Sequence, residues 1–397
     1  MISVAEALET VLSGIVTLSA ETISVADAVD RVLAEDVSAR LTQPPMAVSA
    51  MDGYAVRACD VKSVPTALTC VGAAPAGGTY EGAVSEGECV RIFTGAPIPA
   101  GTDAVIMQED TAREGDRVLV KEPYQSGKFV RQAGLDFSAG KVLLRAGHRL
   151  KARDIGLCAA MNVPWLRVTR KPRVAILATG DELVMPGDPV GPSQIISSNS
   201  LAVAAFVRKL GGDPLDLGIA RDTPEALDSL LAGADRADLL VTLGGASVGD
   251  HDLVVDGLTE RGFELGFHKI AMRPGKPLIF GHVGSTAVLG LPGNPVSAGV
   301  TSVLFLRPAL EKMAGLPPSA LPRDTATLGC DLPENDRRQD YLRADLYRER
   351  DGTFIATPFD KQDSAMLALF ARADCLVVRT PFAPPAKAGD KVDIIRF

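Results

Sequence analysis

The chain has 397 residues, which is too long for one ordinary domain and predicts two to four. Hydrophobic residues make up 46% and charged residues 23%, as is usual for globular proteins. The net charge of −8, without a basic tail, argues against a nucleic-acid or membrane-surface binder, and the longest apolar runs are far too short to span a bilayer.

The N-terminal stretch MISVAEALETVL carries acids and no basic segment, so we expect no signal peptide. Six cysteines are scattered along the chain without a CxxC pair, and the four histidines are dispersed without zinc-ligand spacing. We therefore expect reduced, mostly buried thiols in a cytoplasmic protein, in preference to disulfides or a zinc site.

Residues 2–39 show helical spacing of apolar positions in two successive stretches. Ser3 is a candidate N-cap with Glu6 three residues later, and Ser24 with Asp27 repeats the pattern. Both stretches are predicted to be helices. Because the apolar spacing typical of a helix returns at residues 151–162, we group residues 1–39 with 145–170 as a discontinuous, elongated N-terminal domain.

Residues 40–144 have a different texture, with short strand-like runs between glycine and proline turns. They predict a small β domain inserted into the N-terminal region. This domain carries the sequence MDGY at 51–54, in which Asp52 and Gly53 by themselves indicate only a turn.

In residues 171–315 strands alternate with helices, which predicts an α/β three-layer domain with a mostly parallel sheet. Ligands of such sheets bind at the carboxyl ends of the strands. Residues 316–397 return to alternating strands after a proline-rich entry, and predict a second small, barrel-like β domain. The fold class is thus a multidomain α/β plus β protein.

The stretch DLLVTLGGASVGDHD combines a strand buried on both faces, a glycine-rich turn and the start of a helix. Unpaired backbone N–H groups and missing Cβ atoms there predict an oxyanion cradle at Gly244, Gly245, Ser247 and Gly249. The acids that follow, Asp250 and Asp252, would repel a bare phosphate. A bound cation or a protonated acceptor would remove that conflict.

Acidic side chains also follow the neighbouring strands of the predicted sheet. Asp181 and Glu182 come after one strand and Asp222 after the next, and with Asp252 they would converge on one edge. Such carboxylates bind Mg²⁺ or take part in proton transfer, although an acid at a helix N-terminus is a common alternative. His251, between two acids, is the one histidine with a candidate role.

Three cations stand close together in KIAMRPGKPLIFG, around a Pro-Gly turn: Lys269, Arg273 and Lys276. In an acidic protein this group suggests an oxyanion site, and the alternative is a solvated surface turn. The sequence GLPGNPVSAG provides a further tight turn into a helix, at Pro292, Gly293, Asn294 and Pro295. No nucleophile elbow, Walker loop or GxGxxG sequence is present, so covalent and dinucleotide redox chemistry have little support.

Together these segments resemble the MoeA-type molybdopterin molybdenumtransferases, the family that includes the gephyrin and plant Cnx E domains. The segments are PPMAVSAMDGYAV, RIFTGAPIPAGTDAVIMQED, TGDEL, GGASVGDHD, KIAMRPGKPLIFG and GLPGNPVSA, in that order along nearly the whole chain. The resemblance implies insertion of molybdate into adenylylated molybdopterin, with Mg²⁺-dependent loss of AMP. It also implies a homodimer with clefts shared between subunits.

Residue by residue, the resemblance implies roles for several matched positions. Asp52, Thr94 and Asp136 would line the cleft from the partner subunit, and Glu182, Asp222 and Asp252 would serve the Mg²⁺ and pyrophosphate chemistry. The cation group, with Arg338 and Ser364, would hold molybdate or phosphate, and the two glycine turns would hold the pterin phosphate end. A MogA-type adenylyltransferase and molybdoenzyme maturation proteins are the implied partners.

Two alternatives follow from the same resemblance. The sheet domain alone is similar to MogA-type molybdopterin adenylyltransferases, and the gephyrin domain also serves as a non-catalytic scaffold. One position departs from the family pattern: Arg273 stands where a lysine is usual, which keeps the charge but removes any role as a proton donor at neutral pH.

Overall fold

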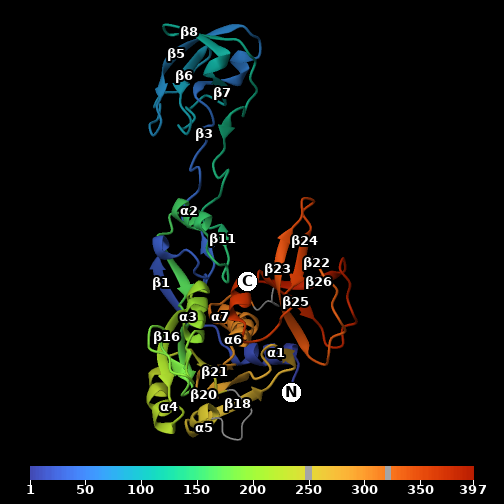
Figure 1. Ribbon diagram of the computed structural model, residues 1–397. Helices are drawn as coiled ribbons and strands as arrows, with labels where there is room; N and C mark the ends of the chain where they lie inside the picture. Colours follow the sequence, from blue (N-terminus) through green and yellow to red (C-terminus); the bar gives the residue numbers. More distant parts are fainter. Residues whose placement is uncertain (246–252, 318–322) are drawn as a thin grey trace.

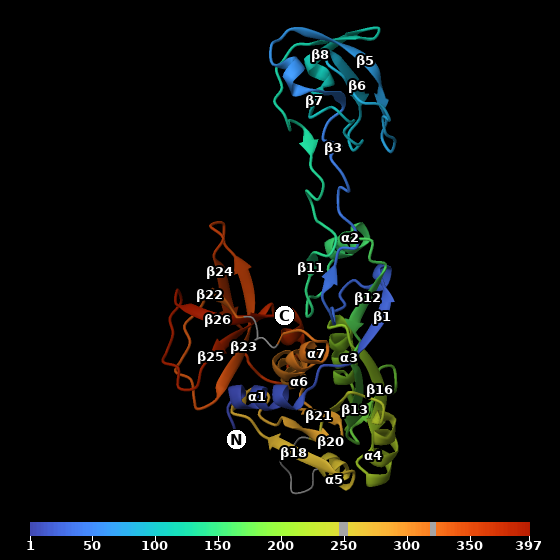
Figure 2. The same ribbon diagram turned by 180° about the vertical axis from the view of Figure 1, so that it is seen from behind.

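The computed structural model describes residues 1–245, 253–317 and 323–397 (Figure 1). A small β unit stands at one end of a long molecule, joined to the rest by two extended connections (Figures 1 and 2). The six-stranded sheet with its helices lies at the other end, and the C-terminal β unit lies beside that sheet.

Helix α1, Val4–Gly14, begins as the sequence predicts. The Ser3 hydroxyl accepts from the Glu6 backbone N–H at 3.2 Å, and the Glu6 carboxylate accepts from the Ser3 N–H at 2.8 Å. This capping box satisfies two backbone donors that no helical carbonyl can reach. The buried side chains of α1 join the core of the six-stranded sheet.

The second predicted helix, from Ser24 onward, is wrong. Strand β1, Ala20–Ser24, pairs antiparallel with β12, Trp165–Thr169, and only one 3₁₀ turn, Val25–Asp27, follows. The Ser24 hydroxyl does accept from the Ala26 N–H at 3.2 Å, so the cap is present without the helix. Within the expected helix, Val32 and Leu33 form bridges with Arg149 and Val168, so long-range pairing outweighs the local helical pattern.

The rest of the N-terminal region is short. Helix α2, Ala152–Ala160, confirms the predicted return of helical structure. Strand β2, Val37–Ser38, pairs with β11, Val142–Leu144, and β3, Val48–Ser49, pairs with β10, Val130–Arg131. Strand β3 lies where the connections enter the small β unit, whereas β11 lies beside α2 at their other end.

The small β unit is a six-stranded sheet with the strand order β7-β4-β6-β5-β9-β8. Its strands are β4 Gly53–Val56, β5 Thr66–Ala74, β6 Glu88–Ile92, β7 Ala104–Met107, β8 Thr111–Glu114 and β9 Arg117–Val120. Gly53 starts β4 and does not merely form a turn. A Cβ atom on Gly53 would lie 1.7 Å from the Ile106 carbonyl oxygen, so only glycine fits this position.

The central unit contains a second six-stranded sheet, with the order β16-β13-β17-β21-β20-β18. Parallel pairings join the first four strands in that order, and β20 is antiparallel to both of its neighbours. The strands are β13 Arg173–Thr179, β16 Asp213–Ala220, β17 Leu239–Leu243, β18 Phe263–His268, β20 Ile279–Val283 and β21 Thr286–Leu291. A small pair, β14 Leu183–Val184 with β15 Ile195–Ile196, follows β13.

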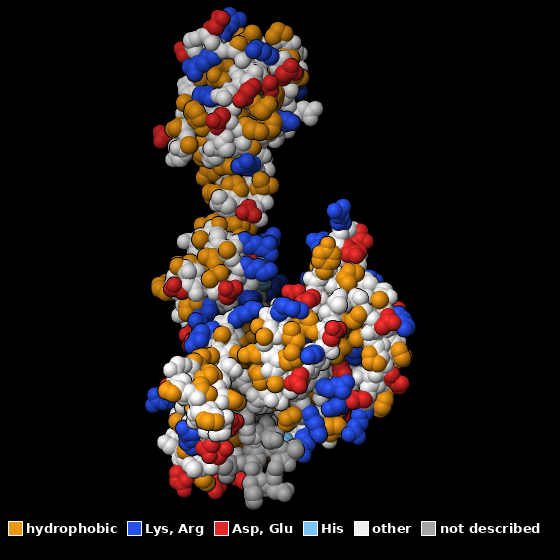
Figure 3. Space-filling model, viewed as in Figure 1, with side chains coloured by type: hydrophobic (Ala, Val, Ile, Leu, Met, Phe, Trp, Pro, Cys, Tyr) orange, Lys and Arg blue, Asp and Glu red, His pale blue; other side chains and the backbone are white. Residues whose placement is uncertain are grey.

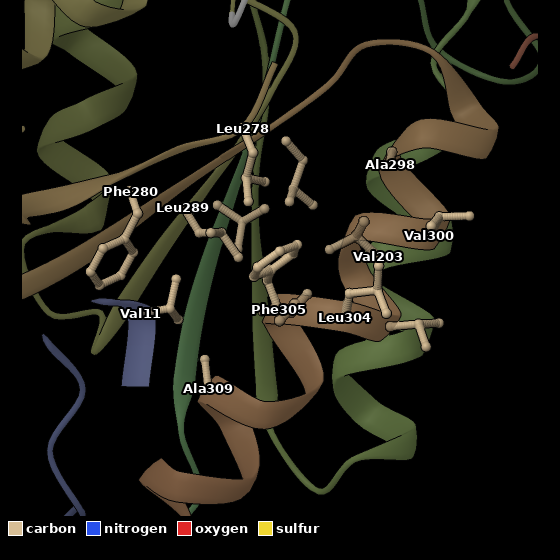
Figure 4. Close-up of a cluster of buried hydrophobic side chains, with 14 of the residues drawn as sticks. Val11, Val203, Leu278, Phe280, Leu289, Ala298, Val300, Leu304, Phe305 and Ala309 are labelled. Atoms are coloured by element: carbon tan, nitrogen blue, oxygen red, sulfur yellow. The ribbon is translucent and has the colours of Figure 1, made fainter. Parts of the chain in front are cut away.

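Helices cover both faces of this sheet. They are α3 Asn199–Lys209, α4 Pro224–Leu231, α5 Leu253–Glu260, α6 Pro295–Thr301 and α7 Arg307–Met313. The π-helical turn Ser302–Leu306 joins α6 to α7. Figure 4 shows Phe305 packed against Leu289 of the sheet, between Val11 of α1 and Val203 of α3.

The C-terminal unit is a closed barrel of five strands. They are β22 Asp324–Leu328, β23 Gln339–Arg348, β24 Phe354–Pro358, β25 Cys375–Arg379 and β26 Lys391–Arg396. The pairing of β23 with β25 closes the barrel. Strand β19, Met272–Arg273, leaves the central unit to pair with β23, and the short helix α8, Leu367–Arg372, lies between β24 and β25 in the chain.

The predicted fold class is confirmed, while the four domain boundaries stay a prediction. In the part of the chain that the structure describes, every helix is too short or too polar to cross a bilayer. All six cysteines are free, and Cys89, Cys158 and Cys375 are buried.

Replacing Gly53 with alanine tests why the MDGY sequence needs its glycine. We expect Gly53→Ala to destabilise the small β unit by about 3 kcal/mol or more, because the new methyl group overlaps a backbone carbonyl that cannot move without breaking the sheet. Urea unfolding measures this. Gly156→Ala is the matched control, since a Cβ there meets no atom within 4 Å and α2 should become slightly more stable. Equal stability of the two variants would contradict the explanation.

Candidate functional site

Two glycine turns meet at the carboxyl edge of the central sheet. Strand β17 ends at Leu243, and the Gly244 N–H donates to the Leu291 carbonyl at the end of β21 at 3.2 Å. Gly244 and Gly245 have φ angles of 92° and 65°. A Cβ on Gly293 would lie 3.6 Å from the Gly244 Cα, so the two turns touch. Ser247, Gly249, Asp250, His251 and Asp252 lie outside the described residues.

The Pro-Gly-Asn-Pro turn links this edge to the C-terminal unit. Pro292 is buried, Pro295 is the first residue of α6, and the Asn294 side-chain amide donates to the Ser364 hydroxyl at 3.1 Å. The Val296 N–H donates to the Ser364 carbonyl, also at 3.1 Å. The structure thus brings Asn294 and Ser364 together although they are far apart in the sequence.

Asn199, at the start of α3, is a residue of this edge that sequence analysis missed. Its side-chain amide donates to the Gly293 carbonyl at 2.6 Å and so fixes the turn from the other side. Its position in the stretch SSNS, directly before the apolar spacing of a helix, was the available signal.

The acidic candidates stand at the ends of the two adjoining strands. Glu182 follows β13 and Asp222 follows β16, and both are exposed. The Asp222 N–H donates to the Asp181 carboxylate at 3.2 Å, and Arg221 donates to the Asp181 carbonyl at 2.8 Å. Asp181 therefore supports the turn, which leaves the carboxylates of Glu182 and Asp222 as the candidate ligands.

These carboxylates suit a Mg²⁺ ion that is bound partly by the substrate. No three His, Cys, Asp or Glu side chains within residues 1–245, 253–317 and 323–397 lie close enough to hold a metal by themselves. Magnesium sites are commonly built from one or two carboxylates together with substrate phosphates, and exposed oxygen donors at this edge suit that arrangement.

The cation group lies between the central unit and the barrel. Lys269 directly follows β18 and has a φ angle of 114°. Arg273 lies in β19, and Lys276, after the Pro-Gly turn, is exposed. The pairing of Met272 with Gln339 brings this segment next to Arg338 of the barrel. Figure 3 shows Lys and Arg side chains gathered at this edge of the barrel, beside the central unit.

Two aspartates that sequence analysis missed organise the arginines. Arg273 donates through Nε to Asp340 at 2.9 Å and lies 3.5 Å from Asp336, while Arg338 donates to Asp336 at 3.0 Å. The hydrogen bond to Asp340 raises the pKa of Arg273, and the one from Arg338 lowers the pKa of Asp336. The alternation of acids and arginines in NDRRQD was the available signal.

The charge of Arg273 is consequently matched by two carboxylates. Lys269 and Lys276, in contrast, form no ion pair with any described residue. The two lysines are therefore the cations most available to an incoming oxyanion at this edge.

The remaining candidates lie in the small β unit. The Asp52 carboxylate accepts from the Thr94 N–H at 2.7 Å and from the Thr94 hydroxyl at 2.8 Å. These hydrogen bonds, the backbone one first, lower the pKa of Asp52. Asp136 lines a hollow of about 570 Å³ together with Gln43 and Arg131. Figures 1 and 2 place this unit far from the central sheet, so one chain does not bring its Asp52 to its own glycine turns.

Comparison with known proteins identifies the family. Residues 2–162 match the MoeA N-terminal region (domain I and II), residues 175–312 match a probable molybdopterin binding domain, and residues 325–397 match the MoeA C-terminal region (domain IV). A molybdopterin molybdenumtransferase of Haemophilus influenzae is 34% identical over 380 residues, which are 95% of this chain and 94% of that protein.

The chain belongs to the MoeA family. A molybdopterin molybdenumtransferase of Nostoc is 42% identical over 72% of this chain and 67% of that protein. Two crystal structures of the MoeA protein from Pyrococcus horikoshii, at 31% and 29% identity, match the whole chain with TM-scores of 0.87 and 0.85 and are themselves covered over 99% and 100% of their length. This MoeA-family member is a transferase of molybdenum cofactor biosynthesis.

Thr94→Val tests the hydrogen bonds that hold Asp52 ionised. We expect the pKa of Asp52 to rise toward its ordinary value but not to reach it, because the Thr94 N–H remains. Since the folded-state pKa is lowered, the interaction stabilises the fold above the ordinary pKa and is lost as the pH falls through the lowered one. NMR titration of the Asp52 carboxyl carbon measures the change. Thr111→Val, which removes a hydroxyl bonded to a backbone carbonyl, should leave it unaltered. An unchanged Asp52 pKa in Thr94→Val would contradict the assignment.

Proposed function

We propose that this enzyme inserts molybdate into adenylylated molybdopterin, with Mg²⁺-dependent release of AMP. The observation that carries the proposal is that two touching glycine turns, two exposed acids and two lysines, which pair with no described carboxylate, all follow or precede strands at the same edge of one sheet in a chain of the MoeA family. Molybdate and the pyrophosphate link are both anions, so their approach to each other requires cations on both.

Different parts of this sheet edge would bind the two anions. Gly244, Gly245 and the turn at Gly293 allow the phosphate end of the pterin to approach the backbone closely. Lys269 and Lys276, with Arg338 and the Ser364 hydroxyl, would hold molybdate on the barrel side. Arg273, already paired with Asp340, would act mainly by fixing the strand that carries these lysines.

Glu182 and Asp222 would hold Mg²⁺ together with phosphate oxygens of the substrate, with Asp252 as a third candidate ligand. The ion would offset the charge on the phosphates and so favour the departure of AMP. The protein's own contribution is to place both carboxylates at adjoining strand ends beside the glycine turns.

We further propose a cytoplasmic homodimer in which Asp52, Thr94 and Asp136 of one subunit complete the cleft of the other. The elongated shape supports this arrangement, because the small β unit is held away from its own sheet on two extended connections. The ionised Asp52 would then face the partner's cations and phosphate chemistry from across the subunit boundary.

Mixed dimers test the shared cleft. Asp52→Ala and Lys276→Ala are each expected to abolish molybdenum insertion in a homodimer. In a heterodimer one cleft would carry both changes and the other none, so about half of the wild-type activity per dimer should return. The assay follows conversion of adenylylated molybdopterin to molybdenum cofactor and AMP by tandem-tagged, purified heterodimers.

The control is a heterodimer in which both changes lie in the same subunit, with a wild-type partner. There each cleft would carry one damaged half, so a shared cleft predicts no activity. If this dimer is half active and the first heterodimer is inactive, each cleft is built from a single chain. If the wild-type enzyme instead consumes ATP to adenylylate molybdopterin, the proposed reaction is wrong.

A further inference from the structure

A buried arginine lies where the barrel meets the central unit. Arg343 of β23 is 1% exposed and pairs across the strand with Leu376 of β25. It lies on the same face of β23 as Tyr341, two residues earlier. Tyr341 and Leu376 both belong to the core that contains the central sheet. Arg343 therefore faces out of the barrel, toward that sheet and its helices.

The environment of Arg343 is costly for a cation. Its Nη2 donates to the Asp363 carbonyl at 3.0 Å, and its Nε is buried without a hydrogen-bond partner among the described residues. Burial lowers the pKa of Arg343, although arginine stays charged in proteins. A methionine would fill similar space without this desolvation cost, so fold stability alone does not account for the arginine.

Gln362 completes the attachment of the same loop. The Arg343 N–H donates to the Gln362 side-chain oxygen at 3.0 Å, and the Gln362 amide donates back to the Arg343 carbonyl at 3.0 Å. The same amide also donates to the Phe359 carbonyl at 2.8 Å. Both ends of the loop from Phe359 to Asp363 are therefore fastened to β23.

This loop carries Ser364 directly after Asp363. Ser364 meets the other unit through two hydrogen bonds, from the Asn294 side chain and from the Val296 N–H, each 3.1 Å long. Hydrogen bonds thus join β23 to the loop, and Ser364 of the same loop to the start of α6. Releasing the loop from β23 would free Ser364 to shift relative to the glycine turns.

We propose that Arg343 and Gln362 are positioning residues that fix Ser364 against α6 and so set the barrel side of the oxyanion site. The inference rests on the proposed function, in which Ser364 contacts molybdate. Neither residue touches the substrate; both act through the main chain of the loop at residues 359–364.

Molybdate binding to the full-length enzyme tests the proposal by isothermal titration calorimetry. Arg343→Met and Gln362→Leu should each weaken molybdate binding about tenfold, and raise KM for molybdate more than they lower kcat. Arg348→Met is the matched control: this arginine is exposed at the end of β23 and lies over the Phe354 ring, away from the loop, so its loss should leave molybdate affinity unchanged.

A double-mutant cycle separates positioning from general stability. In a Ser364→Ala background, Arg343→Met should weaken binding less than about twofold further, because the residue it positions is gone. Gln362→Leu removes no charge and serves if Arg343→Met does not fold, as judged by thermal unfolding. Wild-type affinity in a folded Arg343→Met or Gln362→Leu variant, or full additivity with Ser364→Ala, would overturn the inference. Absence of molybdate binding by the wild-type enzyme would instead refute the proposed function.

Discussion

Met272 and Arg273 pair with Gln339 and Asp340, and this two-residue strand pairing joins the central unit to the barrel. The segment from Lys269 to Lys276 is held against the barrel by this pairing and by ion pairs of Arg273 with Asp340 and Asp336. Arg338 directly precedes the paired residues of β23, and the Asn294 side chain donates to the Ser364 hydroxyl, so two separate contacts join the barrel to the central unit. Loss of this pairing would leave the glycine turns intact and remove the cations beside them.

The charges of the molecule follow from that arrangement. A protein with a net charge of −8 would repel molybdate and phosphates at most of its surface. Within this edge, Asp336 and Asp340 neutralise the arginines that shape it, whereas Lys269 and Lys276 form no ion pair with any described side chain. The positively charged residues therefore differ in role. The arginines, paired with aspartates, stabilise the backbone, whereas the lysines can still pair with an anion.

Local patterns predicted much of the fold. The Ser3 capping box and the alternation of strands with helices depend on neighbours in the sequence, and both are present. The helix expected after Ser24 failed because Val32 and Leu33 form bridges with Arg149 and Val168, more than a hundred residues away, which no local pattern reveals. The requirement for glycine at position 53 is likewise set by a carbonyl on another strand.

For the site, the sequence predicted which residue types would gather but not how they pair. Asn294 and Ser364 both stood among the candidates, yet their contact depends on how the barrel packs against α6. Asp336, Asp340, Asn199 and Arg343 were missed because an acid, an amide or an arginine within a strand or helix start has many ordinary roles. Only tertiary contacts distinguish those roles.

We propose that molybdate binds at the carboxyl edge of the central sheet, against the barrel. Anomalous scattering from a crystal soaked with molybdate and AMP would locate the metal. We expect a molybdenum peak within hydrogen-bonding distance of Lys276, Arg338 and Ser364 from one chain, with the small β unit of a second chain closing the cleft. A reproducible molybdenum peak elsewhere, with this edge empty at the same molybdate concentration, would contradict it.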